Sequence, residues 1–398
     1  MLEGLKVIEY ATYIAAPGAG GIMTDWGADV IKVEPPGGDP IRQFFASAGV
    51  DEEAVNPVFE MDNRGKRGVV LDTTKPQGRD ALLRLIDGAD VFLTNVRPGS
   101  MKRAGLDAGT VRARNKKLIY CSLTGYGLEG PDQDRPGMDA AAFWARSGLA
   151  AMFKPKGGEP IQLRTAFGDH TASLAIVAAI MSALYERNRT GEGRLLDASL
   201  LRTAHYVGAS DFAIQHSRGR IASNRPRANV PNPLVNYFRT ADDRWISLLQ
   251  RQGERDWPKL ARALKVEHLV DDPRFAKARN RRENGAQLVP LLDEAFAARP
   301  YAEIAAALDS VEMVWAPVLT PAEAVSDPQA IAAGCVVETP LHAGGTVKAP
   351  AAPVRFVGAD DGPKGSAPTM GQHTRAVLAQ AGYSAAEIDA MYASGAAL

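Results

Sequence analysis

Leu5-Lys6-Val7-Ile8-Glu9-Tyr10 forms a strand-like run near the start of the chain. Small residues follow it, among them Pro17-Gly18-Ala19-Gly20-Gly21-Ile22-Met23, and then a second strand-like run, Gly27-Ala28-Asp29-Val30-Ile31-Lys32-Val33-Glu34. A strand, a helix and a strand within about 35 residues is the spacing of a right-handed crossover between parallel strands. We therefore expect the chain to begin with a β-α-β unit.

The same alternation continues through the first half of the chain. Apolar runs at 68–71, 90–95 and 118–123 predict strands, and residues 78–86 predict a helix. Short apolar strands between helical segments are typical of a mostly parallel sheet covered by helices. The chain up to about residue 200 is therefore predicted to be α/β.

The character of the sequence changes after that point. Residues 218–233 are polar and aperiodic, 236–239 and 245–249 predict a hairpin, 256–308 have helical periodicity, and the tail has short strands at 335–338 and 345–348 and a helix at 385–392. We predict a large domain from residues 1–202 and 330–398, a linker at 203–224 and a smaller α+β domain at 225–325.

The composition excludes several classes of protein. Among 398 residues, 46 Lys and Arg balance 46 Asp and Glu, so bulk charge gives no reason to expect a nucleic-acid partner. Hydrophobic residues make up 45% and charged residues 23%, as in globular proteins with a buried core. Disordered, collagen-like and disulfide-rich proteins are excluded.

The sequence also favours a cytoplasmic location. Its two cysteines, Cys121 and Cys335, form no Cys-x-x-Cys pair and fit a reducing compartment. No secretion signal is visible at the N-terminus, and the longest apolar stretch, 172–184, is shorter than the roughly 20 residues that span a bilayer. We expect a buried helix there and no membrane partner.

Several common catalytic motifs are missing. There is no G-x-x-x-x-G-K-[ST] loop, and Met23 stands where the third Gly of a dinucleotide-binding turn would be. The six histidines never have the H-E-x-x-H spacing, and no G-x-S-x-G elbow is present. We therefore expect no metal site, no ATP or NAD site and no serine-triad chemistry.

A carboxylate stands in an unusual place, in Phe167-Gly168-Asp169-His170, just before a helix predicted at 171–185. The structural interpretation is that Asp169 caps this helix, since Asp accepts hydrogen bonds from the free N–H groups of a first turn. The functional interpretation is that the helix dipole keeps Asp169 ionised, as a nucleophile toward an activated carbonyl. The two roles are compatible.

Basic residues are frequent in the segments expected after strands. They are Arg42, Arg64, Lys66, Arg67, Arg97, Lys102 and Arg103. Loops at the carboxyl ends of parallel strands bind ligands in α/β folds, and clustered Arg and Lys there could hold phosphates. The alternative is a solvated charged face.

Several motifs occur together in one order along the chain. They are Val30-Ile31-Lys32-Val33-Glu34 with Gly38-Asp39-Pro40 and Arg42, Asn63-Arg64-Gly65-Lys66-Arg67, Asn95-Val96-Arg97-Pro98-Gly99 with Gly105-Leu106, Thr124-Gly125-Tyr126-Gly127-Leu128-Glu129-Gly130-Pro131, Gly168-Asp169, Arg189-Thr190-Gly191-Glu192-Gly193, and Gly371-Gln372-His373-Thr374 with Val377-Leu378. Together they resemble the class III coenzyme A transferases, the CaiB/BaiF family.

The resemblance implies a fold and a mechanism. It implies a large Rossmann-like domain with a parallel sheet built from both chain ends, a smaller domain, and an interlocked homodimer. It implies that Asp169 attacks a donor acyl-CoA and forms an aspartyl anhydride and then an aspartyl-CoA thioester. No permanently bound cofactor is implied, because CoA and acyl-CoA are substrates.

The resemblance also implies which residues contact CoA. These are Ala15, Arg42, Leu71, Lys75, Asn95, Arg97 and Arg103. In some members a glycine-rich loop of the small domain closes over the intermediate. The comparable stretch, Leu248-Leu249-Gln250-Arg251-Gln252-Gly253, has a single Gly and so departs from that glycine-rich pattern, and the sequence leaves the closure of this loop open.

Two other functions are considered. An α-methylacyl-CoA racemase of the same fold needs a second base opposite the aspartate, usually His in Gly-His-Asp, but Gly137-Met138-Asp139 stands here. His170 is poorly placed to replace that base, as the sequence neighbour of Asp169. A non-catalytic CoA-binding protein is the other alternative, and the presence of Asp169 argues against it.

The acceptor acid is predicted from a few apolar residues. Ile14 and Phe143 suggest an apolar pocket, as in the branch of the family that acts on aryl- and alkyl-2-hydroxy acids, although both could be core residues. Met138, Asp139 and His170 complete the predicted substrate pocket. Succinyl-CoA and an unsaturated acyl-CoA remain open as donors.

Overall fold

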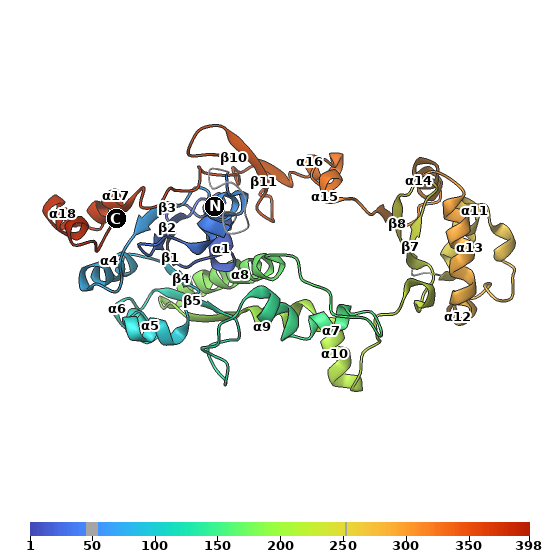
Figure 1. Cartoon of the computed structure of the whole chain (residues 1–398), viewed down its shortest axis with the longest axis horizontal. Helices are drawn as coiled ribbons and strands as arrows, with labels where there is room; N and C mark the ends of the chain where they lie inside the picture. The colour runs from blue at the N-terminus through green and yellow to red at the C-terminus, as the bar shows by residue number, and fades with distance from the viewer. Residues whose placement is uncertain (45–54, 251–252) are drawn as a thin grey trace. The chain divides into compact units, whose positions relative to one another are not determined.

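The computed structural model of the protein describes residues 1–44, 55–250 and 253–398. This part of the chain divides into two compact units (Figure 1). The large unit comprises residues 1–151, 161–221 and 331–398, and the small unit comprises residues 152–160 and 222–330.

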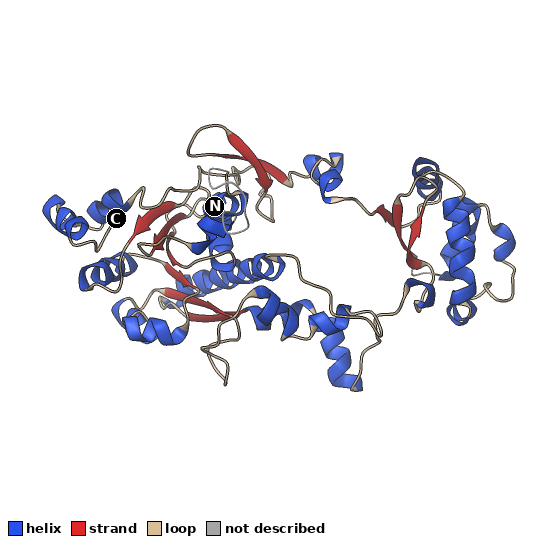
Figure 2. Cartoon of the chain, viewed as in Figure 1, coloured by secondary structure: helices blue, strands red, loops and turns tan. Residues whose placement is uncertain are grey.

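A six-stranded sheet forms the centre of the large unit (Figure 2). Its strands are β1 (Lys6–Tyr10), β2 (Asp29–Glu34), β3 (Arg67–Val70), β4 (Val91–Thr94), β5 (Ile119–Thr124) and β6 (Leu195–Ser199). Their order is β3-β2-β1-β4-β5-β6, and every neighbouring pair is parallel. This is the strand order of a Rossmann fold, so the predicted α/β class is confirmed.

Helices connect these strands, as parallel pairing requires. They are α1 (Ala15–Asp25), α3 (Pro57–Asn63), α4 (Pro76–Asp87), α5 (Pro98–Ala104), α6 (Ala108–Arg114), α7 (Leu149–Phe153) and α8 (Phe167–Thr190), with short helices η1 (Pro40–Gln43) and η2 (Asp139–Ala145). Helices α9 (Leu200–Val207) and α10 (Ala209–Arg218) follow the last strand, β6. Small residues let α1 approach its neighbours closely. A Cβ on Gly18 would lie 2.8 Å from Ser173 Oγ of α8.

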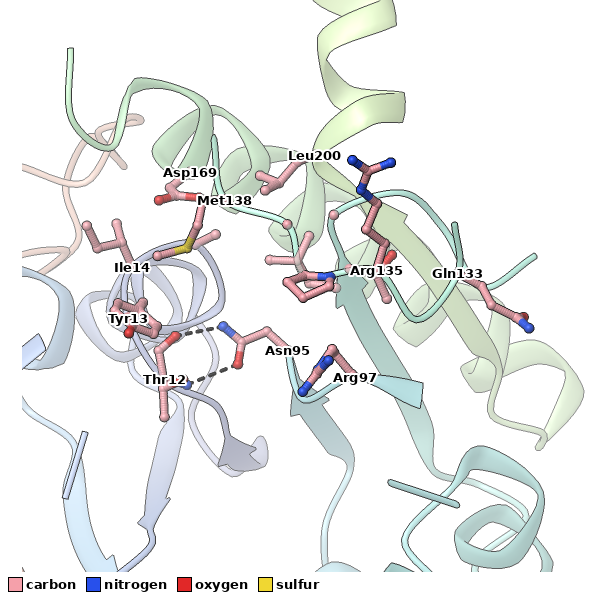
Figure 3. Close-up of a pocket in the computed structure, with 16 residues that line it drawn as sticks. Thr12, Tyr13, Ile14, Asn95, Arg97, Gln133, Arg135, Met138, Asp169 and Leu200 are labelled. Atoms are coloured by element: carbon pink, nitrogen blue, oxygen red, sulfur yellow. Dashed lines mark hydrogen bonds between the residues drawn. The ribbon is translucent and has the colours of Figure 1, made fainter. Parts of the chain in front are cut away.

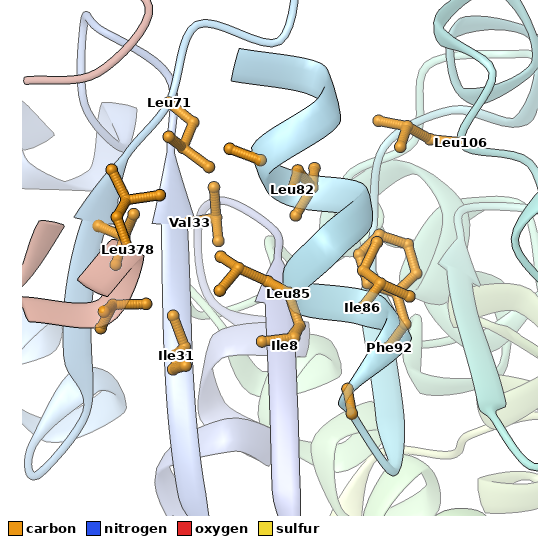
Figure 4. Packing of buried hydrophobic residues seen from close by; sticks show 14 of the residues in the cluster. Ile8, Ile31, Val33, Leu71, Leu82, Leu85, Ile86, Phe92, Leu106 and Leu378 are labelled. Carbon is orange, nitrogen blue, oxygen red and sulfur yellow. The ribbon is translucent and has the colours of Figure 1, made fainter. Parts of the chain in front are cut away.

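The C-terminal segment returns to the large unit as helices. Helices α17 (Thr374–Gln380) and α18 (Ala385–Ala393) place Leu378, Ile388 and Met391 in the same buried cluster as Ile8, Val33 and Phe92 (Figure 4). The prediction that both chain ends build the sheet is wrong, because all six strands lie between residues 6 and 199. Both ends build the core instead.

The two short strands predicted in the tail form their own hairpin. Strands β10 (Val336–Pro340) and β11 (Thr346–Pro350) pair antiparallel with each other. Each strand ends on a proline, which has no N–H to donate to a further ladder. The hairpin is a separate two-stranded sheet and not part of the parallel sheet.

The small unit combines an antiparallel sheet with helices. It contains β7 (Val235–Arg239), β8 (Trp245–Leu249), β9 (Trp315–Pro317), α11 (Gly253–Leu264), α12 (Ala278–Glu283), α13 (Gly285–Ala297), α14 (Tyr301–Ser310), α15 (Pro321–Ala324) and, at its boundary, α16 (Pro328–Ala332), with short helices η3 (Arg227–Asn229) and η4 (Glu267–Leu269). The predicted hairpin is confirmed as β7 and β8. Phe238 and Phe296 stack at 4.5 Å in the core of this unit.

The segment predicted as a linker, 203–224, is largely helical. Helices α9 and α10 cover most of it, and residues up to 221 belong to the large unit. No residue of α10 is buried, which explains why its sequence lacks an apolar stripe.

Among the described residues, one helix, α8, is long and apolar enough by composition to cross a membrane. The core helix of a soluble protein can have the same length and apolar composition. Seven residues of α8, including Ile176 and Ile180, are buried, and the helix packs along α1. We interpret α8 as a core helix.

Candidate active site

The strand order places a ligand site at one end of the sheet. The direction of chain winding reverses between β1 and β4, and α/β folds bind ligands outside the carboxyl ends of strands at such a point. A cavity of about 500 Å³ lies there (Figure 3). Its lining residues end β5, follow β1, β4, β5 or β6, or belong to α8: Thr12, Tyr13, Ile14, Ala15, Asn95, Arg97, Leu123, Thr124, Gly125, Gln133, Arg135, Pro136, Gly137, Met138, Asp169 and Leu200.

Asp169 contributes a carboxylate to this cavity from the first turn of α8. The helix begins at Phe167, four residues earlier than predicted, because Ala166 takes the left-handed N-cap conformation with φ 67°. The prediction that Asp169 is the N-cap is therefore wrong. No hydrogen bond to its carboxylate is found within the described residues, so the group is available to a ligand.

The surroundings of Asp169 favour its protonated form. Burial, and then the carboxylate of Asp139, raise the pKa of Asp169 to about 7. The sequence-based expectation that the helix dipole keeps this group fully ionised is wrong, because local sequence did not reveal the burial or the second carboxylate. Near neutral pH Asp169 is divided between its acid and its nucleophilic form.

Gly168 sets how closely α8 approaches η2. A Cβ on Gly168 would lie 2.6 Å from Cγ of Phe143, so only glycine fits here. Phe143 is fully buried behind Gly168 and does not line the cavity, which places it in the core. Asp139 begins η2, and its Oδ2 is buried with no hydrogen-bond partner in the described structure.

His170 points away from the site of its neighbour. Its Nε2 lies 3.1 Å from Oδ1 of Asp62, and it lines a separate cavity from Asp169. Burial lowers the pKa of His170, but the hydrogen bond and charge of Asp62 outweigh this and leave the pKa raised. The structure therefore places His170 outside the predicted substrate pocket.

The loop between β1 and α1 forms one wall of the cavity through Ile14 and Ala15. Asn95 fastens this loop, as Figure 3 shows: the Thr12 N–H donates to Asn95 Oδ1 at 3.0 Å, and Asn95 Nδ2 donates to the Thr12 carbonyl at 2.6 Å. The side-chain amide of Asn95 is thus occupied by Thr12. Asn95 would therefore support CoA binding indirectly, by holding the loop in place.

Arg97 and Arg103 are both exposed. Arg97 lines the cavity, and its guanidinium makes no hydrogen bond or ion pair within the described residues. Arg103 donates to Ser100 Oγ at 2.9 Å and does not line the cavity. Of the two guanidiniums, that of Arg97 is free to bind an anion.

The other residues expected to contact CoA lie outside this cavity. Arg42 makes a two-point contact with Glu34, at 2.8 and 2.6 Å, and its guanidinium is thereby occupied. Leu71 is fully buried in the core. Lys75 donates to the carbonyl of Ser394 at 2.6 Å and remains partly exposed.

Three more of the basic residues that the sequence placed after strands lie between α3 and β3 or at the start of β3, and they are paired within the fold. Arg64 binds Asp25, Lys66 binds Glu9 and Arg67 binds Asp29. Arg64 and Lys66 are buried. They therefore belong neither to an exposed phosphate site nor to a solvated charged face, the two alternatives that the sequence suggested.

Sequence reasoning missed several lining residues. Gln133 and Arg135 follow β5, and Leu200 follows β6. The rule that ligands bind at carboxyl ends of strands could have found the loop after β5. The strand β6 was not predicted, and so nothing in the sequence indicated that Leu200 lies at the end of a strand. In the small unit, Arg251 and Gln252 of the compared loop lie outside the described residues.

The chain belongs to CoA-transferase family III, whose family model matches residues 2–374. It is 32% identical to an (R)-2-hydroxy-4-methylpentanoate CoA-transferase of Clostridioides difficile, covering 98% of this chain and 97% of the relative. It is 31% identical to a cinnamoyl-CoA:phenyllactate CoA-transferase of Clostridium sporogenes, covering 98% and 95%. The crystal structure of a CaiB/BaiF family protein from Brucella suis matches with a TM-score of 0.84 at 31% identity, covering 95% and 98%. The protein is thus a family III CoA-transferase.

Proposed function

We propose that this enzyme moves CoA from an acyl-CoA to a free carboxylic acid, with Asp169 as the covalent nucleophile. The observation that carries this proposal is the Asp169 carboxylate, which lines the cavity at the carboxyl edge of the sheet without a hydrogen-bond partner in the described residues. An unpaired carboxylate in a ligand cavity is suited to attack a thioester carbonyl.

The proposed reaction exchanges one thioester for another. Asp169 attacks the donor carbonyl, the C–S bond breaks, and an aspartyl-acyl anhydride and CoA thiolate form. The thiolate attacks the aspartyl carbonyl, which releases the donor acid and leaves aspartyl-CoA. The acceptor carboxylate then attacks this thioester and forms a second anhydride, and the thiolate attacks its acyl carbonyl. Acceptor acyl-CoA leaves and the Asp169 carboxylate is restored.

Arg97 is the proposed contact for the CoA phosphates. It is exposed, lines the cavity and is unpaired within the described residues, and a guanidinium offers a planar fork of donors to a pyrophosphate. Arg103 and Lys75 are further candidates, and Ala15 contributes to the wall. Asn95 supports CoA binding by fixing the loop at Thr12.

The acceptor we propose is an apolar monocarboxylic acid, 2-hydroxylated or aromatic. Ile14, Met138 and Leu200 give the cavity near Asp169 an apolar wall. The relatives from the two clostridial species are named for 2-hydroxy-4-methylpentanoate and phenyllactate, which are acids of this kind. A clear preference for dicarboxylic acceptors would contradict this part of the proposal.

We do not favour racemisation. It would need a second base facing Asp169, but Met138 lines the cavity there and His170 is turned toward Asp62.

We further propose that the enzyme acts as an interlocked homodimer. Large apolar side chains on the helices around the site remain exposed, including Leu174 and Tyr185 on α8 and Tyr206 and Ile214 on α9 and α10. Exposed apolar groups of this size are typical of protein interfaces. Sedimentation at micromolar concentration would show a dimer, and a monomer would contradict the proposal.

Trapping the covalent intermediate tests the nucleophile. The enzyme is incubated with a panel of acyl-CoAs and hydroxylamine, and its peptides are mapped by mass. We expect a hydroxamate on the peptide that carries Asp169, and none in Asp169→Ala. Asp62→Asn serves as a control for general labelling of carboxylates. A protein that binds CoA but forms no adduct with any thioester would contradict covalent transfer.

A further inference from the structure

Four charged side chains lie buried between α1 and the sheet, behind the loop that forms a wall of the cavity. Lys32 Nζ lies 3.3 Å from Glu9 Oε1 and 2.8 Å from Asp39 Oδ2, and Lys66 Nζ lies 2.7 Å from Glu9 Oε2. All four side chains are fully buried. A Cβ on Gly20 of α1 would lie 2.0 Å from Glu9 Oε2, so α1 packs directly onto this network.

The formal charges of the network are balanced near neutral pH. Burial lowers the pKa of Lys66 to about 8, which still leaves it protonated. Burial opposes the charge of Lys32 as well, but Glu9 and Asp39 outweigh burial and raise the pKa of Lys32. Two ammonium groups thus face two carboxylates.

The network contacts the backbone of the wall loop at two points and the first turn of α1 at a third. Lys32 Nζ donates to the Ala11 carbonyl at 3.2 Å, and Lys66 Nζ donates to the Pro17 carbonyl at 2.8 Å. Between them, the Tyr13 N–H donates to Asp39 Oδ1 at 2.9 Å. Tyr13 has φ 65°, a left-handed conformation that residues other than glycine rarely adopt. The contacts therefore hold an unfavourable backbone conformation in place.

We propose that Asp39 and Lys32 are positioning residues that hold the loop at Ala11 and Tyr13, so that Ile14 and Ala15 form the wall of the acyl-CoA site. Neither residue lines the cavity, so they act through the loop. This inference rests on the proposed function of the cavity. The positioning role can be measured separately from a stabilising role, because a buried ion pair can often be replaced by apolar residues without loss of stability.

Two double variants separate the effect of the hydrogen bond between Tyr13 and Asp39 from the effect of the charges of Lys32 and Asp39. Lys32→Met with Asp39→Asn removes one charge of each sign and keeps an oxygen that can accept from Tyr13. Lys32→Met with Asp39→Leu also balances the charge but removes that acceptor. Thermal unfolding shows whether the leucine variant is folded. If it is not, Lys32→Met with Asp39→Ala is used in its place.

The readouts are the dissociation constant for CoA by calorimetry and the KM for an acyl-CoA donor. We expect the asparagine variant, which loses the contact of Lys32 with Ala11, to raise both constants about threefold. The leucine variant, which also loses the acceptor for Tyr13, should raise both constants about tenfold with a smaller change in kcat. A matched control, Arg64→Met with Asp25→Leu, removes a buried ion pair that does not touch the loop and should leave both constants unchanged.

Equal constants for the asparagine and leucine variants, or an equal increase in the control, would overturn the positioning role. A wild-type protein that fails to bind CoA gives a different pattern, since it contradicts the function of the cavity before any variant is compared.

Discussion

Asp169 combines accessibility to the cavity with a pKa near 7. A carboxylate of ordinary pKa is a weak base and a weak nucleophile, whereas a partly buried one gains reactivity when it ionises. The neighbouring Asp139 adds to this effect, with a buried oxygen that has no hydrogen-bond partner in the described structure. The two carboxylates therefore set the pH range in which the free enzyme can react.

The pH dependence of kcat/KM for the acyl-CoA donor follows from this pKa. Burial and Asp139 raise the pKa of Asp169 to about 7, so the nucleophile is protonated below pH 7, and kcat/KM should fall about tenfold per pH unit there. Asp139→Asn removes the second cause, lowers the pKa of Asp169 and moves the acid limb to lower pH. Asp80→Asn, an exposed carboxylate on α4, is the control. An acid limb that Asp139→Asn leaves in place would contradict this account.

Arg97 and Arg42 should behave differently although the resemblance assigned both to CoA. Arg97→Ala should raise the KM for acyl-CoA about tenfold with little change in kcat, because a guanidinium that binds phosphate contributes uniform binding. Arg42→Met should lower the melting temperature instead, because it leaves the buried Glu34 unpaired. Steady-state kinetics and thermal unfolding of both variants test this, with Arg79→Ala as an exposed control. A KM effect only in Arg42→Met would reverse the assignment.

At the scale of elements, the contact of α8 with η2 fixes the nucleophile. Gly168 lies directly on Phe143, and Asp169 follows it in the first turn of α8. The loop between β1 and α1 forms a wall of the same cavity and is held by Asn95 and by the buried ion network. The two elements also contact each other directly, because Ser173 Oγ of α8 donates to the Ala15 carbonyl at 2.7 Å.

Gly168→Ala should displace the start of α8. Its Cβ would lie 2.6 Å from Phe143 Cγ, so we expect a loss of stability of about 1–3 kcal/mol and a fall in kcat larger than any rise in KM. Phe143→Leu in the same chain should restore part of the activity by making room. Gly37→Ala, where a Cβ meets nothing within 4 Å, is the control. Full activity of Gly168→Ala would show that this contact does not position Asp169.

At the scale of the whole molecule, local sequence predicted what depends on local pattern. The buried strands β1 to β5 were found because each has adjacent apolar residues such as Val7-Ile8 and Val30-Ile31, whereas β6, which is only partly buried and has an exposed Leu195, was missed. The three-residue strand β9 was also too short to recognise. The return of the C-terminal helices to the core was inferred from the family resemblance.

The candidate site was predictable only in part. Asp169 was found from its place before a helix and from the resemblance. The contact of Asn95 with Thr12 joins residues 83 positions apart, and that of Lys66 with Glu9 joins residues 57 positions apart. Such pairs depend on the strand order, which no local pattern reveals. This is why Arg42, Lys66 and Asn95 were read as ligand contacts or surface charges, and why the raised pKa of Asp169 was not foreseen.

The transfer of oxygen from the acceptor acid to Asp169 tests the central claim most directly. The enzyme turns over unlabelled acyl-CoA with an acceptor acid whose carboxylate carries oxygen-18. The mass of the peptide containing Asp169 is then measured by mass spectrometry. Covalent transfer passes an acceptor oxygen to Asp169 when the second anhydride breaks, so the peptide should gain about 2 Da for each oxygen exchanged, up to two oxygens. A peptide that stays unlabelled while labelled acyl-CoA accumulates would contradict the mechanism, because the acceptor would then have reacted without bonding to Asp169.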